Sequence, residues 1–327
     1  MPLIRAAAAL ALLVASLAPA QGQNWPTRPV TIVVPLAAGG GPDALARILA
    51  PHLTERLGRQ VVIENVPGAG GTTGSNRVAK APPDGYQSVI GNVGTHAQSM
   101  TLYKHPPYNA ATDFAPVSLI AVLPLVLITR NDLPANTLPE FIAYAKANQA
   151  RMQYGSPGAG SAGHLACVLL NAAIGINVTH VPYRSGASTF GTQDLIAGRI
   201  DYMCPTLALA LAAIEGKSIK AIAVLTRERA PRLPALASAH EQGLAGFDAG
   251  AWNGLFLPKG TPATIVHKLN EAVVGTMDMP SVQTRLNEIG VMPVGREQRS
   301  PAYLQKLVES EIKKWAGPIK ASGATAE

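Results

Sequence analysis

Residues 30–58 read VTIVVPLAAGGGPDALARILAPHLTERLG and contain one complete pattern of strand, turn and helix. Residues 30–34 form an unbroken run of β-branched side chains, which is typical of a strand buried on both faces. Residues 43–57 carry apolar side chains at a spacing of three and four, which predicts a helix that ends at Gly58. The turn at 35–42 holds three consecutive glycines. Such a turn offers unpaired backbone N–H groups and the positive end of a helix dipole, which together favour an anion.

Two further glycine-rich turns follow the same plan. They read PGAGGTTG at 67–74 and GSPGAGSAG at 155–163, each between a strand-like run and a helix-like run. Strands that alternate with helices predict a parallel sheet with right-handed crossovers. Because ligands collect at the carboxyl ends of parallel strands, all three turns are expected at a binding edge. Tight turning without a ligand would explain one such turn well, and three of them less well.

The same pattern continues along the chain and predicts an α/β protein. Strands are expected at residues 30–34, 61–63, 87–91, 119–129 (as one strand or two), 152–155, 178–183, 199–203, 221–225 and 252–256. Helices are expected at residues 43–57, 72–80, 138–147, 163–174, 189–197, 262–276, 282–289 and 301–319. A chain of 327 residues exceeds the ~250–300 that one core usually supports, so two domains are expected. No internal repeat or low-complexity linker separates them, which favours a pair of crossing strands as the boundary.

The first 20 residues have the layout of a secretory signal peptide. The basic start ends at Arg5, residues 6–18 are almost wholly apolar, and Ala18-Pro19-Ala20 is a small-x-small cleavage site. We expect cleavage after Ala20 and a location in the periplasm. An uncleaved membrane anchor is the alternative, but the apolar segment is shorter than the ~20 residues that a span needs. No Cys directly follows this segment, so a lipid anchor is not supported.

Charge and cysteine content narrow the range of partners and covalent links. The formal net charge is +7, but the Lys and Arg residues are scattered without a dense run, so we expect no nucleic-acid partner. Cys167 and Cys204 could pair in an oxidising periplasm, but a spacing in sequence does not fix their geometry. We therefore expect two separate buried thiols.

No enzyme motif in the sequence is accompanied by the other residues that its function requires. Residues 158–163 match G-x-G-x-x-G, but a dinucleotide site also needs an acid about 20 residues on, and residues 161–193 contain none. Residues 216–218 resemble the end of a P-loop, but Leu211 stands where a glycine is required. There is no G-x-S-x-G, H-E-x-x-H or C-x-x-C, and the seven His residues are dispersed. We expect no catalysis, no cofactor and no metal ion, which leaves binding.

Four polar residues near these turns are candidates for ligand contact. Asp43 is best interpreted as a helix-start acid that caps N–H groups, with contact to an ammonium group or a water as the alternative. His164 stands just inside the helix after the third turn, where it either lines a pocket or packs in the core. Thr95 and His96 follow the third predicted strand and are candidate wall residues of a pocket.

The chain resembles the periplasmic solute receptors of tripartite tricarboxylate transporters, often called Bug proteins. The resemblance covers nearly the whole mature chain and rests on an ordered set of motifs. They are Trp25-Pro26-x-Arg28-Pro29, the Val-Pro-x-x-x-Gly-Gly-x-x-Asp turn that ends at Asp43, Asn65 to Gly71, Pro82 to Tyr86, Tyr154 to Ser161 with His164-Leu165, His180 to Arg184, Asp194 to Asp201, Trp252-x-Gly254 and Pro258-x-Gly260-Thr261-Pro262. Any one of these motifs is weak evidence, but the ordered set is specific.

The resemblance implies a two-lobed clamshell, each lobe a mostly parallel sheet flanked by helices. Residues 25–125 plus 244–327 are expected to form one lobe and 126–243 the other. The turn at 36–42 would meet one end of a small carboxylate, and the turn at 156–163 would hold its carboxylate group. Residues 41 and 42 are Gly-Pro where many members carry a small hydroxyl pair. This difference leaves backbone and water to contact the distal group of the ligand.

We therefore expect a monomeric periplasmic receptor that delivers a small organic acid to the subunits of a membrane transporter. A secreted enzyme and a sensor-type binding protein are the alternatives. The hydroxyls of Ser156 and Ser161 would hold the carboxylate beside backbone N–H groups, while Arg184 would contact either the ligand or the opposite lobe. The expected ligand-binding residues are Ala37, Ala38, Gly39, Gly40, Gly41, Asp43, Gly71, Thr72, Thr95, His96, Ser156, Gly160, Ser161, Ala162, Gly163, His164, Arg184 and Asp201.

Overall fold

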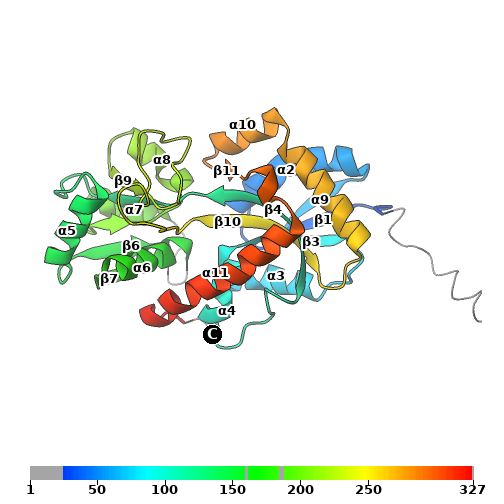
Figure 1. The fold of residues 1–327 in the computed structure, drawn as a ribbon, viewed down its shortest axis with the longest axis horizontal. Coiled ribbons are helices and arrows are strands. Elements are labelled where there is room, and N and C mark those ends of the chain that lie inside the picture. Colours follow the sequence, from blue (N-terminus) through cyan, green and yellow to red (C-terminus); the bar gives the residue numbers. More distant parts are fainter. Residues whose placement is uncertain (1–24, 159–160, 184–187, 326–327) are drawn as a thin grey trace, which may run out of the picture.

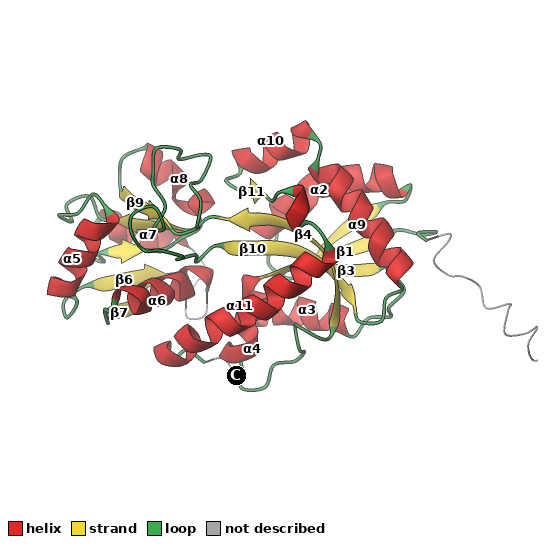
Figure 2. Cartoon of the chain, in the orientation of Figure 1, coloured by secondary structure: helices red, strands yellow, loops and turns green. Residues whose placement is uncertain are grey.

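The computed structural model describes residues 25–158, 161–183 and 188–325, which form two α/β lobes side by side (Figures 1 and 2). Each lobe has its own sheet with helices packed against it. We call the part built on the six-stranded sheet lobe 1 and the part built on the five-stranded sheet lobe 2. The two-lobed α/β fold expected from the sequence is therefore confirmed.

The sheet of lobe 1 is mixed, with parallel and antiparallel neighbours. Its strands lie in the order β11 (Met292–Pro293), β4 (Phe114–Leu123), β10 (Ala251–Pro258), β3 (Gln87–Asn92), β1 (Val30–Val34) and β2 (Val61–Asn65). The first strand pairs in parallel with β2 and β3, whereas β10 pairs antiparallel with β3 and β4, and β11 pairs antiparallel with β4. The residues of β1 other than Thr31 are almost fully buried, as its continuous β-branched run predicts.

Lobe 2 repeats this mixed arrangement. Its strands lie in the order β7 (Thr179–Pro182), β6 (Gln153–Ser156), β8 (Tyr202–Met203), β5 (Val126–Thr129) and β9 (Lys220–Val224). Here β6 is parallel to both neighbours, and β5 is antiparallel to β8 and β9. The expected mostly parallel sheets are thus found only in part. Strands β5 and β10 run the other way because each enters its lobe from the opposite lobe.

Helices cover the faces of both sheets. In lobe 1 they are α2 (Gly41–Leu57), α3 (Thr72–Ala79), α4 (Ser99–Leu102), α9 (Ala263–Met277), α10 (Pro280–Glu288) and α11 (Pro301–Ser322), with short helices η1 (Ala69–Gly71), η2 (Gly94–Gln98) and η3 (Arg296–Gln298). In lobe 2 they are α5 (Leu138–Asn148), α6 (Ala162–Ile174), α7 (Ser188–Ile196) and α8 (Leu207–Glu215). No helix among the described residues has both the length and the apolar character to cross a bilayer.

The chain passes between the lobes in two places, at the short link between β4 and β5 and between β9 and β10. At the first crossing, Leu125 accepts a hydrogen bond from the N–H of Leu225, which ties the two crossing segments together. A third connection comes from α11, which packs on β4 of lobe 1 and also contacts α6 of lobe 2 (Figure 1). Crossing segments therefore link the lobes, as expected from the lack of a low-complexity linker.

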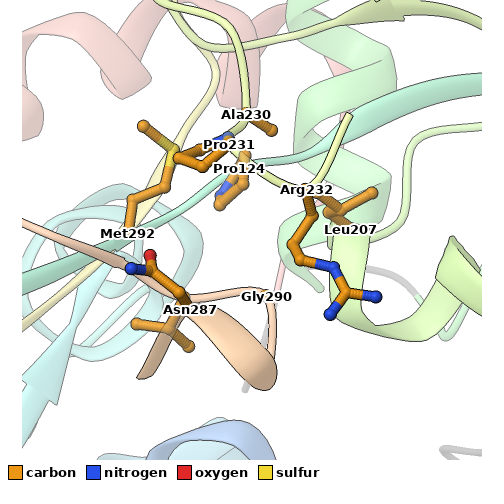
Figure 3. Close-up of a pocket in the computed structure, with 9 residues that line it drawn as sticks. Pro124, Leu207, Ala230, Pro231, Arg232, Asn287, Gly290 and Met292 are labelled. Carbon is orange, nitrogen blue, oxygen red and sulfur yellow. The ribbon is translucent and has the colours of Figure 1, made fainter. Parts of the chain in front are cut away.

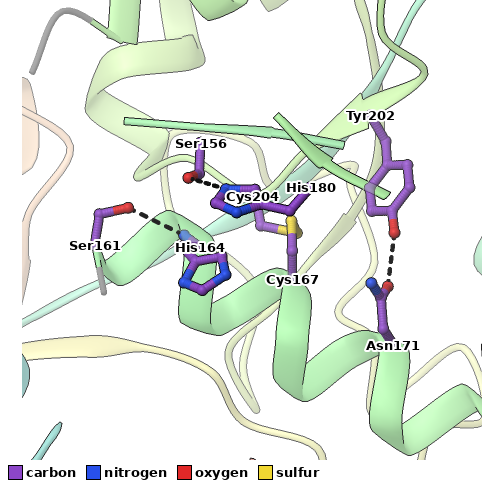
Figure 4. The surroundings of a disulfide bond; sticks show 8 residues. All are labelled: Ser156, Ser161, His164, Cys167, Asn171, His180, Tyr202 and Cys204. Carbon is purple, nitrogen blue, oxygen red and sulfur yellow. Dashed lines mark hydrogen bonds between the residues drawn. A yellow bond between two sulfur atoms is a disulfide. The ribbon is translucent and has the colours of Figure 1, made fainter. Parts of the chain in front are cut away.

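A disulfide joins Cys167 of α6 to Cys204, the residue that follows β8 (Figure 4). The expectation of two separate thiols is wrong. The helix packs directly on the end of the strand, which brings the two Cα atoms to 5.6 Å, a distance within the range that disulfides adopt. The sequence spacing carried no information about this packing.

Candidate functional site

The two sheets turn the carboxyl ends of their parallel strands toward each other. In lobe 1, β3 ends at Asn92 beside Asn253 of β10, close to the end of β10 where the chain arrives from lobe 2. In lobe 2, β8 is antiparallel to β5, so it ends where β5 begins and where the chain enters from lobe 1. The strands β1 and β2 follow the direction of β3, and β6 and β7 follow that of β8. The turns after these strands therefore border the gap between the lobes.

The first glycine turn is an exposed loop on the lobe 1 side of this gap. Its members Ala37, Ala38, Gly39, Gly40 and Gly41 are all exposed. The backbone at Gly39 has a φ of 83°, a conformation that glycine adopts at little cost. The amino end of α2 follows directly, and no side chain caps it. The loop thus presents backbone, rather than side chains, to the gap.

Asp43 stabilises this loop through hydrogen bonds within lobe 1. The carboxylate accepts hydrogen bonds from the N–H of Gly39 at 2.9 Å and from Nδ2 of Asn65 at 3.0 Å, and it pairs with Nε of Arg47 at 3.0 Å. Burial alone would raise the pKa of Asp43, but the hydrogen bonds from these three groups lower it overall. All of these partners belong to lobe 1, so Asp43 shapes the loop before α2 and does not cap the N–H groups of the helix itself.

The second glycine turn is exposed at residues 67–70 and packs inward at Gly71 and Thr72. Gly71 has a φ of 96°, and a Cβ there would lie 2.8 Å from Cγ2 of Thr95 and 3.0 Å from the carbonyl oxygen of Pro35. Thr72 is 3% exposed, and its hydroxyl donates to the carbonyl of Ala69 at 2.8 Å. The absence of a side chain at residue 71 therefore allows the second turn to support the base of the first.

Thr95 and His96 lie inside lobe 1 rather than on a cleft wall. Both are 0% exposed, and the His96 ring stacks on Phe256 at a centroid distance of 4.1 Å. Burial lowers the pKa of His96 to about 3, so its imidazole is neutral. The chain turns into η2 directly after β3 and carries the ring inward. Gly91 makes room for it, since a Cβ there would lie 2.5 Å from the ring. The expected wall role of these residues does not fit this burial.

The third glycine turn ends at the amino end of α6 on the lobe 2 side. Ser161 is the N-cap, and its hydroxyl accepts from the N–H of His164 at 3.2 Å and donates to the carbonyl of Gly158 at 2.7 Å (Figure 4). The hydroxyl of Ser156 contacts the N–H of Gly158 at 3.2 Å and Nε2 of His180 at 2.7 Å. Both serine hydroxyls thus shape the turn itself, a role that the sequence reasoning had not assigned to them.

The start of α6 lies tight against the end of β8. A Cβ at Gly163 would lie 3.2 Å from the carbonyl oxygen of Cys204, so a larger residue would push the helix outward. Ala162 before it is half-buried and forms the first residue of the helix. The disulfide from Cys167 to Cys204 fixes the same helix to the same strand. The amino end of α6 is therefore held rigidly at the gap.

Behind this turn lies a stack of aromatic rings. His164 and His180 stack at a centroid distance of 4.1 Å, and Tyr154 stacks on His180 at 4.9 Å and on Tyr202 at 5.5 Å. Burial, together with the nearby His180, lowers the pKa of His164 to about 4, and burial also lowers the pKa of His180. Both histidines are therefore neutral near pH 7. His164 packs in this stack with only 5% of its surface exposed.

Asp201 lies at the opposite end of lobe 2 from the gap. It precedes β8, and its carboxylate pairs with Arg130 at 3.0 Å and accepts from the N–H of Gln153, the first residue of β6, at 2.8 Å. A residue before a parallel strand belongs to the amino edge of the sheet, so a ligand role in the gap does not fit this position. Gly160 and Arg184 lie outside the described residues.

Sequence reasoning missed the part played by His180. The signal available was a polar residue in the middle of the strand predicted at 178–183, next to the strand that leads into the third turn. In the structure His180 pairs with Tyr154 in the register of β6 and β7. It is the link between the aromatic stack and the turn.

A small cavity between the lobes is the alternative site (Figure 3). Its lining includes Pro124, Leu207 and Arg232 on one side and Asn287 and Gly290 on the other. Its volume of about 10 Å³ holds one water molecule at most, so it cannot take an organic acid. No group of three or more potential metal ligands occurs within the described ranges. The gap between the glycine turns is the better candidate.

The chain is similar to a known protein family and to solved structures. The model of the family described as "Tripartite tricarboxylate transporter family receptor" matches residues 45–324. The solved periplasmic binding protein BugD is 36% identical, with 93% of this chain and 100% of that chain covered and a TM-score of 0.76. MatC from Rhodopseudomonas palustris, solved with bound malate, is 38% identical, with 90% and 100% covered and a TM-score of 0.76. Another protein of that species, solved with adipate, is 36% identical, with 92% and 99% covered and a TM-score of 0.78.

Proposed function

Because the chain belongs to the family of tripartite tricarboxylate transporter receptors, we propose that it captures a small dicarboxylate between its lobes and delivers it to a membrane transporter. Members of this family are periplasmic solute-binding proteins and not enzymes. The similar proteins solved with malate and adipate both hold a short chain with a carboxylate at each end. Two anionic ends need two anion-binding positions, one for each carboxylate.

The observation that carries the proposal is the pair of helix amino ends that border the gap. The first residues of α2 follow the exposed glycine turn of lobe 1, and the first residues of α6 follow the third glycine turn of lobe 2. Each offers backbone N–H groups and the positive end of a dipole to one carboxylate. Within the described parts of both turns there is no Lys or Arg side chain. Backbone and water would therefore make the main contacts with the ligand.

Closure of the lobes would retain the ligand between them. A dicarboxylate that touches both helix ends can do so only when the lobes approach, so it favours the closed arrangement by the contacts made there. Secretion through cleavage after residue 20 would place the monomeric receptor in the periplasm, beside its transporter. A sensor that passes its closed form to a signalling partner is the second candidate function, since closure would serve it equally well.

The experiment is a thermal-shift and calorimetric screen against succinate, malate, adipate, citrate, acetate and glutamate. A ligand at a hundredfold excess over its Kd stabilises the folded state by about 2.7 kcal/mol, which gives a clear rise in Tm. We expect the rise with dicarboxylates and recovery of the ligand intact and in stoichiometric amount. Absence of a shift with every acid would contradict the proposal, and turnover of a bound acid would favour the secreted enzyme.

Ala162→Asp provides a sharp variant for the same screen. An acid at the first residue of α6 suits the helix dipole and so preserves stability, but it repels a ligand carboxylate at that end. We expect binding to be lost while Tm without ligand is unchanged or slightly raised. Ala162→Asn is the matched control, with the same size and no charge. If Ala162→Asp bound as tightly as the control, the carboxylate would not sit at α6.

A further inference from the structure

One short hydrogen bond joins His180, a member of the aromatic stack of lobe 2, to the third glycine turn. Nε2 of His180 lies 2.7 Å from the hydroxyl of Ser156, which is 1% exposed. The same hydroxyl lies 3.2 Å from the N–H of Gly158 and 3.1 Å from its carbonyl oxygen. Figure 4 shows His180 directed at Ser156 on the side away from Ser161. Strand β7 therefore contacts the turn through a side chain as well as through the backbone.

The turn needs such a contact because of the conformation at Gly158. Its φ is 139°, far from the helical and extended regions, and a Cβ there would meet no atom within 4 Å. The space on the Cβ side of this residue is therefore open. Its polar groups bond to the hydroxyls of Ser156 and Ser161, and its carbonyl also accepts from the N–H of Ser161 at 3.2 Å. These hydrogen bonds tie Gly158 to Ser161, the N-cap of α6.

The hydroxyl of Ser156 has one proton and three polar neighbours. It accepts from the N–H of Gly158 at 3.2 Å and lies 3.1 Å from the carbonyl oxygen of Gly158 and 2.7 Å from Nε2 of His180. The carbonyl of Gly158 also accepts from the hydroxyl of Ser161 at 2.7 Å and from the N–H of Ser161 at 3.2 Å. The contact with His180 is the shortest that Ser156 makes, so loss of Nε2 removes the closest partner of this hydroxyl.

We propose that His180 is a positioning residue for ligand binding, which acts by fixing Ser156 and thereby the turn that aims the amino end of α6 at the ligand. This inference rests on the proposed function, since it names what holds the carboxylate-binding end of the same site. His180 need not touch the ligand. The rings of Tyr154 and His164 stack on it and keep its imidazole in the plane that Ser156 requires.

The test is a double-mutant cycle on ligand affinity. His180→Phe keeps a ring in the stack and removes Nε2, and Ser156→Ala removes the hydroxyl. Each variant should bind the best dicarboxylate of the wild-type screen about tenfold more weakly. The double variant should bind no more weakly than either single variant, because both changes break the same link. Tyr154→Phe is the matched control, since it alters the same stack without touching the turn, and its affinity should equal that of the wild type.

A rescue separates positioning from general stability. His180→Gln offers an amide oxygen that can accept from Ser156, so it should recover most of the affinity that His180→Phe loses. Independent losses that add in the double variant, or a His180→Phe protein with wild-type affinity, would overturn the inference.

A second readout does not depend on any ligand. Amide hydrogen exchange at Gly158 and Ser161 should be faster in His180→Phe than in Tyr154→Phe. If the wild type binds no carboxylate but these results hold, the proposed function fails while the positioning role stands. Equal exchange in both variants would reject the positioning role whatever the ligand.

Discussion

At the scale of single residues, Asp43 determines the shape of the first glycine turn. Replacing it by Ala would leave the N–H of Gly39 without its acceptor, and the amide of Asn65 would keep only its bond to the carbonyl of Leu36. We expect Asp43→Ala to lower the free energy of unfolding by about 1–3 kcal/mol and to weaken ligand binding. Urea unfolding and calorimetry measure the two effects.

Arg47→Ala is the control for this change, because it removes the ion pair but leaves both hydrogen bonds. The side chain of Arg47 is 54% exposed, so its loss should cost less than ~1 kcal/mol. The pKa of Asp43 is lowered in the folded state, so its contribution is present above its ordinary value of 3.8 and is lost as the pH falls through the lower folded pKa. Equal effects of the two variants would contradict the role of Asp43 as an acceptor for the turn.

His96 predicts how stability depends on pH. Its pKa falls from 6.5 to about 3 on folding because burial disfavours the charged ring. A depressed folded pKa means that the stability is fully present above pH 6.5 and declines as the pH falls toward 3. His96→Phe keeps a ring among Phe114 and Phe256 and removes the titration. Between these pH values the wild type should lose about 1.4 kcal/mol per pH unit relative to the variant.

The measurement is the free energy of unfolding of both proteins at pH 7.5, 6 and 5. A difference between them that stays constant over this range would show that His96 does not titrate on unfolding. His164, whose pKa is lowered to about 4, should keep some acid sensitivity in the variant.

At the scale of secondary-structure elements, the disulfide attaches α6 to β8. It closes a loop with a sequence separation of 37 residues, for which the loss of chain entropy in the unfolded state gives about 4 kcal/mol. We expect the double variant Cys167→Ala, Cys204→Ala to unfold at correspondingly lower urea concentration. Addition of a reductant should lower the stability of the wild type and leave the variant unchanged. A wild type that is insensitive to reduction would contradict the prediction.

Element boundaries were predictable where the side-chain pattern has a clear period. The run at 30–34 and the spacing after Asp43 correctly predicted β1 and α2. By contrast α8 was missed, because LALALAAIE is apolar throughout and lacks a polar face to define a helical period. The direction of β10 could not be predicted either. A strand that returns from another lobe has the same composition as one that follows a helix.

Site residues were predictable where chain order fixes their edge of the sheet. The turns after β1 and β6 border the gap, because they follow parallel strands. Asp201 could have been assigned to the other edge by the same rule, since it precedes its strand. The buried position of His96 could not be predicted, because η2 turns the chain inward after β3. This turn depends on packing in the folded protein. The stack around His180 depends on the pairing of β6 with β7, which the sequence does not state.

At the scale of the whole molecule, α8 of lobe 2 meets the segment after α10 of lobe 1. A Cβ at Gly290 would lie 3.4 Å from Ala208, next to the cavity between the lobes. Gly290→Leu should therefore act as a wedge that changes the angle between the lobes. Small-angle scattering of the ligand-free protein should show a changed radius of gyration, and the ligand affinity should change with it.

Gly198→Leu is the matched control for the wedge. Both glycines have a φ of 71°, so both variants carry the same backbone cost, but a Cβ at residue 198 meets no atom within 4 Å. The control should lose stability by about 1 kcal/mol without a change in scattering. Identical scattering curves for the two variants would show that the contact between α8 and the α10 segment does not set the angle.

The strand order of lobe 1 also determines how much of the chain must be synthesised before this lobe can fold. Strand β10 lies between β3 and β4, and α11 packs on β4, so this lobe needs about the last quarter of the chain for its sheet and the helix on it. Lobe 2, by contrast, is continuous between its two crossings. During synthesis from the amino end, the strands within about the first 123 residues cannot form the complete sheet. They lack the central strand β10 until residue 258 has been synthesised. The nascent chain should therefore remain accessible to chaperones and export machinery over most of its length, and it becomes a receptor only once it is complete.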